Sequence, residues 1–161
     1  MKKTIFIGQA MPRVKRNPHD WPSLNQWLYS ISLTDELIRK YTLYSALVDY
    51  FPGAVNGSHN IPSKEEIGNE RARLAKAITD FGPEIVIPIG RLSISYCLNQ
   101  RVQPLTNHIG SIYFANPYGL YSKELTIIPL PHPSGASTWR HNSENKALLT
   151  KALQLLKSKL F

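Results

Sequence analysis

The sequence predicts an α/β fold, a three-layer sandwich in which a four- or five-stranded, mainly parallel sheet lies between helices. Strand-like apolar runs alternate with amphipathic helical segments, and glycine or proline follows several of these runs. The length of 161 residues suits a single domain over residues 1–161. Hydrophobic residues make up 42% of the chain and charged residues 19%, which is typical of a globular protein.

The first part of the chain is expected to hold one strand, a basic loop and two helices. Residues 3–8 are β-branched and aromatic up to a glycine, the pattern of a buried strand. Three prolines and three cations predict an irregular basic loop over residues 11–23. Apolar residues at helical spacing then predict a helix with Ser23 as its N-cap, and Thr34 fits the N-cap of a second helix.

A second strand and a well-marked helix follow. Residues 41–51 are rich in tyrosine, leucine and valine and predict the strand, and residues 52–62 predict a loop. The sequence Ser63-Lys64-Glu65-Glu66 is a capping box, because a serine and a glutamate three residues apart can satisfy the free amides at a helix start. The apolar stripe behind it predicts a helix up to Phe81.

The remaining elements alternate in the same way. Residues 84–89 are almost continuously apolar and end at Gly90, which predicts a buried parallel strand that leads into a glycine turn. Residues 92–98 predict a short helix. The last three elements are two strands and an amphipathic terminal helix, at residues 111–115, 125–130 and 143–160.

The charge of the chain favours a polyanionic partner. Lysine and arginine total 19 against 11 acidic residues, a net charge of +8 that favours nucleic acid, although a merely solvated basic surface has the same composition. The apolar run at residues 5–7 is too short for a signal peptide or a membrane span. The single cysteine, Cys97, excludes an internal disulfide and any metal or iron-sulfur site built on several thiolates. We expect a cytoplasmic monomer without a cofactor or membrane contact.

Three segments that follow predicted strands contain the candidate chemistry: residues 8–12, 90–93 and 132–135. Ligand sites in an open parallel sheet lie at the carboxyl ends of its strands, so these segments are predicted to meet in one crevice, although structural turns look similar. His132 lies between two prolines, which restrict its backbone, and its imidazole can donate a hydrogen bond to a developing anion. Ser134 can bind a phosphate oxygen or simply cap the turn.

Three motifs also occur in a specific order along the chain. They are Gly8-Gln9-Ala10-Met11-Pro12, the segment of residues 62–91, and His132-Pro133-Ser134-Gly135. In this order they resemble the water-activating loop, the helix and central strand, and the His-Pro-Ser loop of the uracil-DNA glycosylase superfamily. The likeness touches most of the chain and is greatest to the thermophile-type branch, whose members normally carry an iron-sulfur cluster.

The resemblance implies a DNA-binding site that holds a flipped-out base. It places the first motif beside the base. It also implies that Gln9 orients the attacking water and that His132 stabilises the leaving base. Trp21 is either the stacking aromatic or a core tryptophan. The catalytic candidates are His132 and Gln9, the substrate-binding candidates are Gly8, Ala10, Trp21, Ala46 and Ser134, and the DNA-binding candidates are Arg13, Lys15, Arg16, Gly135, Trp139 and Arg140.

The chain departs from the family's pattern at several positions. The first motif contains no carboxylate, and Ser45 or Ala46 stands where an asparagine normally reads the pyrimidine edge. Ala136 replaces the leucine that normally wedges into the duplex, so that Trp139 is either the wedge or a packing residue. The lone Cys97 leaves the iron-sulfur cluster of the closest branch without ligands.

Three functions are compatible with these residues. The first is a glycosylase that hydrolyses the N-glycosidic bond of uracil or another deaminated base in base-excision repair. The second is a non-catalytic DNA-binding protein of the same fold that senses lesions or single strands. The third is a nucleotide-binding α/β protein unrelated to repair, although the chain lacks a phosphate-loop glycine pattern. A carboxylate beside a pocket water would favour the first, and Asp20 and Asp49 are the nearest candidates, each also explained as a surface residue or cap.

Overall fold

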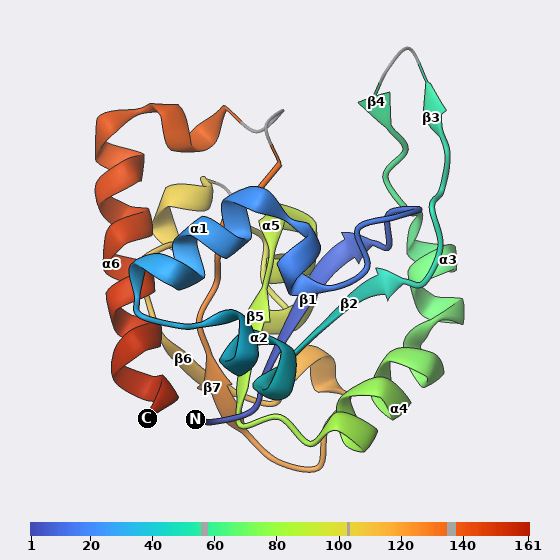
Figure 1. The fold of residues 1–161 in the computed structure, drawn as a ribbon. Coiled ribbons are helices and arrows are strands. Elements are labelled where there is room, and N and C mark those ends of the chain that lie inside the picture. Colours follow the sequence, from blue (N-terminus) through green and yellow to red (C-terminus); the bar gives the residue numbers. More distant parts are fainter. Residues whose placement is uncertain (56–57, 103, 135–137) are drawn as a thin grey trace.

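The computed structural model, which describes residues 1–55, 58–102, 104–134 and 138–161, contains a five-stranded sheet in the order β2-β1-β5-β7-β6 (Figure 1). Neighbouring strands pair in parallel, except that β6 runs antiparallel to β7 at one edge. The sheet confirms the predicted fold class. Its strands are β1 (Thr4–Ala10), β2 (Thr42–Val48), β5 (Ile85–Pro88), β6 (Tyr113–Ala115) and β7 (Leu125–Ile127).

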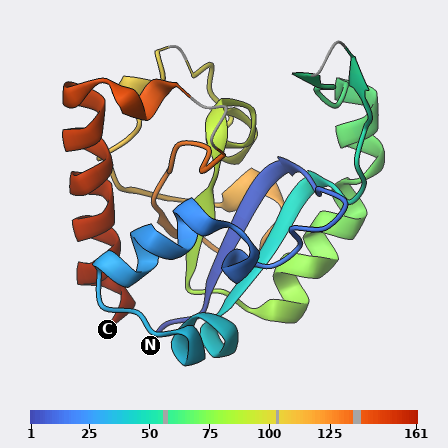
Figure 2. The ribbon, with the colours of Figure 1, turned by 45° about the horizontal axis from the view of Figure 1, so that its top comes forward.

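Helices cover both faces of the sheet and form the outer layers of the sandwich (Figures 1 and 2). One apolar cluster joins the sheet to α1, α2 and α6, and a second joins its other face to α3, α4 and α5. No helix in the described part of the chain is long and apolar enough to span a membrane. The helices are α1 (Pro22–Ser30), α2 (Asp35–Tyr41), α3 (Lys64–Asn69), α4 (Arg71–Phe81), α5 (Gly90–Leu98) and α6 (Ser143–Leu160).

The alternation of side chains along β1 explains the two clusters. Ile5 and Ile7 belong to the cluster under α4 and α5, whereas Phe6 belongs to the cluster under α1 and α6. All three side chains are completely buried. A strand with apolar residues on both faces can only lie in the middle of a sandwich, and β1 accordingly pairs with β2 on one side and β5 on the other.

The predicted helix caps are partly confirmed. The Ser63 hydroxyl accepts a hydrogen bond from the Glu66 amide while Glu66 accepts one from the Ser63 amide, so the capping box is present. Thr34 caps α2 as expected. The prediction of Ser23 as the cap of α1 is wrong: Trp21 is the N-cap, because Pro22 lacks an amide hydrogen and suits the first helical position.

Two predicted boundaries shift because of strand pairing. β1 continues through Ala10, so Gln9 and Ala10 are strand residues and not loop residues. The added length pairs with β2, with Ala10 opposite Val48 and the Met11 amide donating to the Val48 carbonyl at 3.1 Å. β2 itself ends at Val48, earlier than predicted.

The predicted loop over residues 52–62 and the predicted helix up to Phe81 are also corrected. The loop contains a two-stranded antiparallel ladder of β3 (Ala54–Val55) and β4 (Ser58–His59), which projects past the end of the sheet at which β1 and β2 finish (Figure 1). The helix is divided into α3 and α4 at Glu70, which caps the end of one and the start of the other.

Candidate functional site

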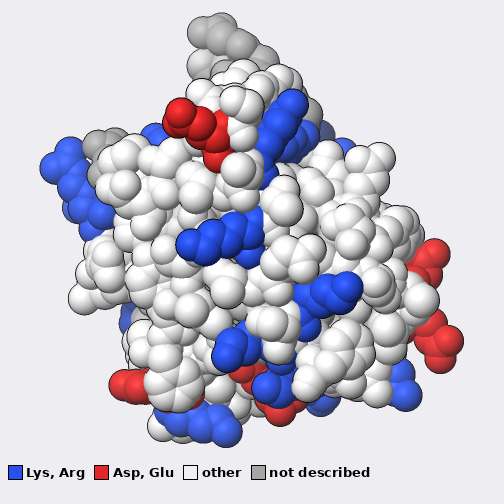
Figure 3. Space-filling view, turned by 90° about the vertical axis from the view of Figure 1, so that its left-hand side faces the viewer, with Lys and Arg blue, Asp and Glu red and all other residues white. Residues whose placement is uncertain are grey.

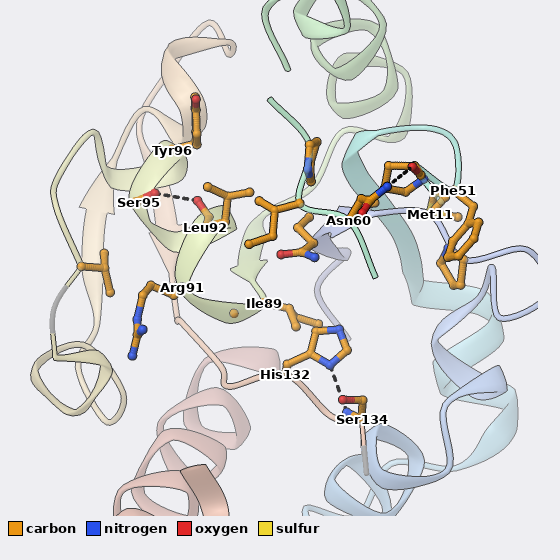
Figure 4. Close-up of a pocket in the computed structure, with 18 of the residues that line it drawn as sticks. Met11, Phe51, Asn60, Ile89, Arg91, Leu92, Ser95, Tyr96, His132 and Ser134 are labelled. Carbon is orange, nitrogen blue, oxygen red and sulfur yellow. Dashed lines mark hydrogen bonds between the residues drawn. The ribbon is translucent and has the colours of Figure 1, made fainter. Parts of the chain in front are cut away.

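A groove of about 1990 Å³ lies where the parallel strands end. Its floor contains Ile89 and His132, with α5 on one side and the segments after β1 and β2 on the other (Figure 4). The volume exceeds the 300–1,000 Å³ that is typical of small-ligand pockets, so the groove is wide enough for more than one nucleotide. Seven of the candidate residues line it: Gln9, Ala10, Arg13, Lys15, Trp21, His132 and Ser134.

His132 is held in place by contacts on several sides. The Ser134 amide donates to its Nδ1 atom at 3.1 Å (Figure 4). Arg140 donates to its carbonyl oxygen at 3.1 Å. The Trp21 ring meets the imidazole edge-on at 5.4 Å between centroids. Gly90, whose φ is +82°, brings its backbone beside the imidazole with no side chain of its own. Because Nδ1 accepts a hydrogen bond, the neutral ring carries its proton on Nε2 and can act as a donor there.

Trp21 forms a nearly buried wall of the groove. Only 7% of its surface is exposed, and it stacks on Tyr44 with 5.9 Å between centroids and 29° between planes. Lys15 places its Nζ atom 5.2 Å from the centre of the indole. The structure therefore gives Trp21 a packing contact with Tyr44 in addition to its place beside His132.

Two residues that were predicted to bind substrate are buried, and Tyr44 lies against one of them. Gly8 and Ala46 pair across β1 and β2 and do not line the groove. A Cβ atom on Gly8 would lie 3.2 Å from the Cζ atom of Tyr44 and still closer to its hydroxyl. Burial raises the pKa of Tyr44, so the phenol is neutral at physiological pH. Tyr44 was missed from the sequence, although it lies two residues before Ala46 and hence on the same face of β2.

The cations of the loop after β1 each contact the protein body. The Arg13 guanidinium lies 4.8 Å from the centre of the Phe51 ring, and Arg16 pairs with Asp49 at 3.0 Å. Asp20 accepts the amides of Arg16 and Asn17 and thus serves as a cap. Neither Asp20 nor Asp49 lines the groove.

The charged residues that line the described part of the groove are all basic. Among the described lining residues there is no aspartate or glutamate, and six are lysine or arginine: Arg13, Lys15, Lys64, Arg71, Arg91 and Arg101. Arg91 belongs to the segment of residues 90–93 that was predicted to reach the crevice. Lys64, Arg71 and Arg101 were missed from the sequence, because nothing in their local pattern shows that they converge. Positive charge also spreads over the face formed by α6, as Figure 3 shows. Such a field attracts a polyanion and retains it along the groove.

The described residues hold no recognisable metal site. No group of three or more histidine, cysteine, aspartate or glutamate side chains is placed to hold an ion among them. Cys97 is buried in α5, and burial raises the pKa of its thiol to about 12. The thiol therefore stays protonated at neutral pH and is a poor nucleophile or ligand.

The comparison with protein families agrees with this arrangement. A model of the uracil DNA glycosylase superfamily matches residues 2–157 of the 161. The chain belongs to the uracil DNA glycosylase superfamily. A search of curated proteins found no match.

In this superfamily member, Trp139 and Arg140, which follow His132 in the chain, contact the body of the protein. Besides its bond to the His132 carbonyl, Arg140 donates to the Ser23 hydroxyl at 3.3 Å and lies 5.6 Å from the centre of the Trp27 ring. Trp139 is partly buried against the core, and its indole nitrogen is buried without a partner among the described residues. Arg140 and Trp139 therefore make packing contacts here, and Gly135 and Ala136 lie outside the described residues.

Replacing Arg140 by methionine is expected to lower the free energy of unfolding by about 1–2 kcal/mol, because two hydrogen bonds from a charged donor are lost. Urea unfolding measures this change, and the NMR resonances of the His132 ring are expected to shift with it. Arg101→Met is the matched control, since Arg101 is an exposed groove arginine. Equal stability of the two variants would show that these two hydrogen bonds of Arg140 do not stabilise the fold.

Proposed function

We propose that this protein binds DNA along the basic groove and hydrolyses the N-glycosidic bond of a flipped-out uracil or other deaminated base, as a base-excision repair glycosylase. The single observation that supports this most is the placement of His132. Its Nδ1 atom accepts a hydrogen bond from the Ser134 amide at 3.1 Å, and the ring lies on the floor of a groove whose charged lining residues, in the described part of the chain, are all basic. A donor there can stabilise the negative charge that develops on a departing base.

The reaction would proceed in two stages. Extrusion of the nucleotide costs a few kcal/mol, which phosphate contacts with the groove cations offset. The C1′–N bond then breaks with its electron pair going to the base, and the oxygen of water forms the new bond to C1′. His132 stabilises the base anion, while the Gln9 amide orients the water, whose proton ends on the released base or in solvent.

The second candidate is a non-catalytic DNA-binding protein of the same fold. A specific observation favours it: no carboxylate lines the described part of the groove, and Asp20 and Asp49 are engaged elsewhere. Ala46 also offers no amide to read a pyrimidine edge. Under this hypothesis the groove would retain damaged or single-stranded DNA without cutting it.

The test is to incubate the purified protein with end-labelled single- and double-stranded oligonucleotides that each carry one uracil, hypoxanthine or xanthine. Alkali-labile abasic sites are then scored, and DNA binding is measured in parallel by fluorescence anisotropy. Abasic product on one of these bases would establish the glycosylase and name its substrate. Binding without product on any base would favour the non-catalytic protein.

A further inference from the structure

Tyr118 begins a buried chain of hydrogen bonds that ends on β1. Its hydroxyl lies 2.6 Å from the hydroxyl oxygen of Ser93, which donates to the Ile7 carbonyl at 2.5 Å. Because the single hydroxyl proton of Ser93 goes to that carbonyl, Tyr118 must be the donor to Ser93. Ser93 is completely buried and Tyr118 is 4% exposed. The chain thus joins η3 (Pro117–Gly119) to β1 through α5.

The backbone of Tyr118 is strained. Its φ is +59° and its ψ is 6°, in the left-handed region, where a bulky residue is stable only when its surroundings hold it. The hydroxyl chain is one such contact, and Arg71 provides another, because its guanidinium donates to the Tyr118 carbonyl at 3.2 Å. Burial raises the pKa of the Tyr118 phenol, which therefore stays protonated and keeps donating at physiological pH. Glycine would adopt this backbone without strain but would leave Ser93 without its donor.

The carbonyl at the end of this chain connects the elements that carry the two candidate catalytic residues. Ile7 lies two residues before Gln9 in β1, and its carbonyl also accepts the Ile89 amide at 2.9 Å. Ile89 lines the groove and precedes Gly90, whose backbone lies beside the His132 imidazole. Both lone pairs of the Ile7 carbonyl oxygen are therefore used, and the hydroxyl chain adds a side-chain bond at the point where β1 meets the segment beside His132.

We propose that Ser93, oriented by Tyr118, is a positioning residue that sets the separation of the two candidate catalytic side chains, an inference that rests on the proposed function. Its hydroxyl is bonded within the protein and acts through the backbone of β1, not on the substrate. In the hydrolysis, the water held by Gln9 and the base held by His132 share one carbon, C1′, so the two side chains must keep a fixed separation. A displacement of about 1 Å can slow such a reaction about 10²-fold. Loss of the Ser93 bond is expected to slow the chemical step and to leave DNA binding intact, because Ser93 does not line the groove.

The first test replaces Ser93 by alanine. The single-turnover rate of base release at saturating DNA is expected to fall roughly tenfold, while the half-saturating DNA concentration stays within about twofold of wild type. The matched control is Tyr113→Phe, which removes a hydroxyl that hydrogen-bonds to His108 at 2.9 Å from β6, outside the groove lining, and should leave the rate unchanged. A rate for Ser93→Ala equal to that of the control would overturn the inference.

A double variant separates positioning from stability alone. Ser93→Ala leaves the buried Tyr118 hydroxyl without its partner, which lowers the free energy of unfolding measured in urea. Adding Tyr118→Phe removes that hydroxyl, so part of the lost stability should return. The rate of base release should stay low, because the bond to the Ile7 carbonyl is still missing. A rate that recovers together with stability would overturn the inference, since the chain would then only stabilise the fold.

A measurement without DNA distinguishes failure of this inference from failure of the proposed function. In proton–nitrogen NMR spectra, Ser93→Ala is expected to shift the signals of the Gln9 side-chain amide and of the His132 ring, and Tyr113→Phe to shift neither. Unshifted signals in Ser93→Ala would overturn the inference. If the wild-type protein forms no abasic site on any base, the glycosylase is refuted, and these signals still decide whether Ser93 couples the positions of the two side chains.

Discussion

Replacing His132 by alanine is expected to lower kcat/KM for base release by about 10²- to 10³-fold, the loss of roughly 2.7–4 kcal/mol that follows removal of one well-placed donor to a developing anion. The orientation of the imidazole is fixed by its neighbours, since the Ser134 amide donates a hydrogen bond to Nδ1 and Trp21 contacts the ring edge-on. The measurement is single-turnover cleavage of the preferred oligonucleotide. Binding of intact DNA should change little, because the donor acts mainly in the transition state.

The matched control for this prediction is His141→Ala. His141 is an exposed histidine at the end of η4 (Trp139–His141) and does not line the groove. Its removal deletes an imidazole from the same part of the chain and should leave the rate unchanged. A rate for His132→Ala that stays near that of His141→Ala would show that base release does not depend on His132.

Gly8→Ala is expected to lower the free energy of unfolding by about 1–3 kcal/mol, the usual penalty for an extra methyl group in a filled core. The new Cβ atom would press on the hydroxyl end of Tyr44. That side chain is only 4% exposed and stacks on Trp21, so it cannot turn away without moving the wall of the groove. Urea unfolding, followed by intrinsic tryptophan fluorescence, measures the change.

Tyr44→Phe supplies the partner for a double-mutant cycle. The Tyr44 hydroxyl makes no hydrogen bond to the described residues, and therefore its removal alone should change stability little. In the double variant the methyl group gains the space of the hydroxyl, and most of the lost stability should return. Additive effects of the two substitutions would show that the contact between Gly8 and Tyr44 is not the cause.

Several features depended only on local sequence and were therefore predictable. The capping box at Ser63 satisfies amides within its own helix turn, and the continuous apolar run in β1 gives the strand two buried faces wherever it lies. The order of strands and helices implied a parallel sheet with its ligand site at the carboxyl ends. That rule also anticipated that Gln9 and His132, more than a hundred residues apart, would line one groove.

The tertiary structure decided whatever required a partner distant in the chain. Pairing with Val48 turned Ala10 and Gln9 from loop into strand. Tyr44 packs on Gly8, and both Gly8 and Ala46 are buried in the pairing of β1 with β2, outside the groove lining. Contacts with distant residues also bound Arg16 and Arg140 to the protein body. A side chain's charge and size can be read from the sequence, but its free energy of interaction depends on which distant atoms surround it, and only the folded chain determines those.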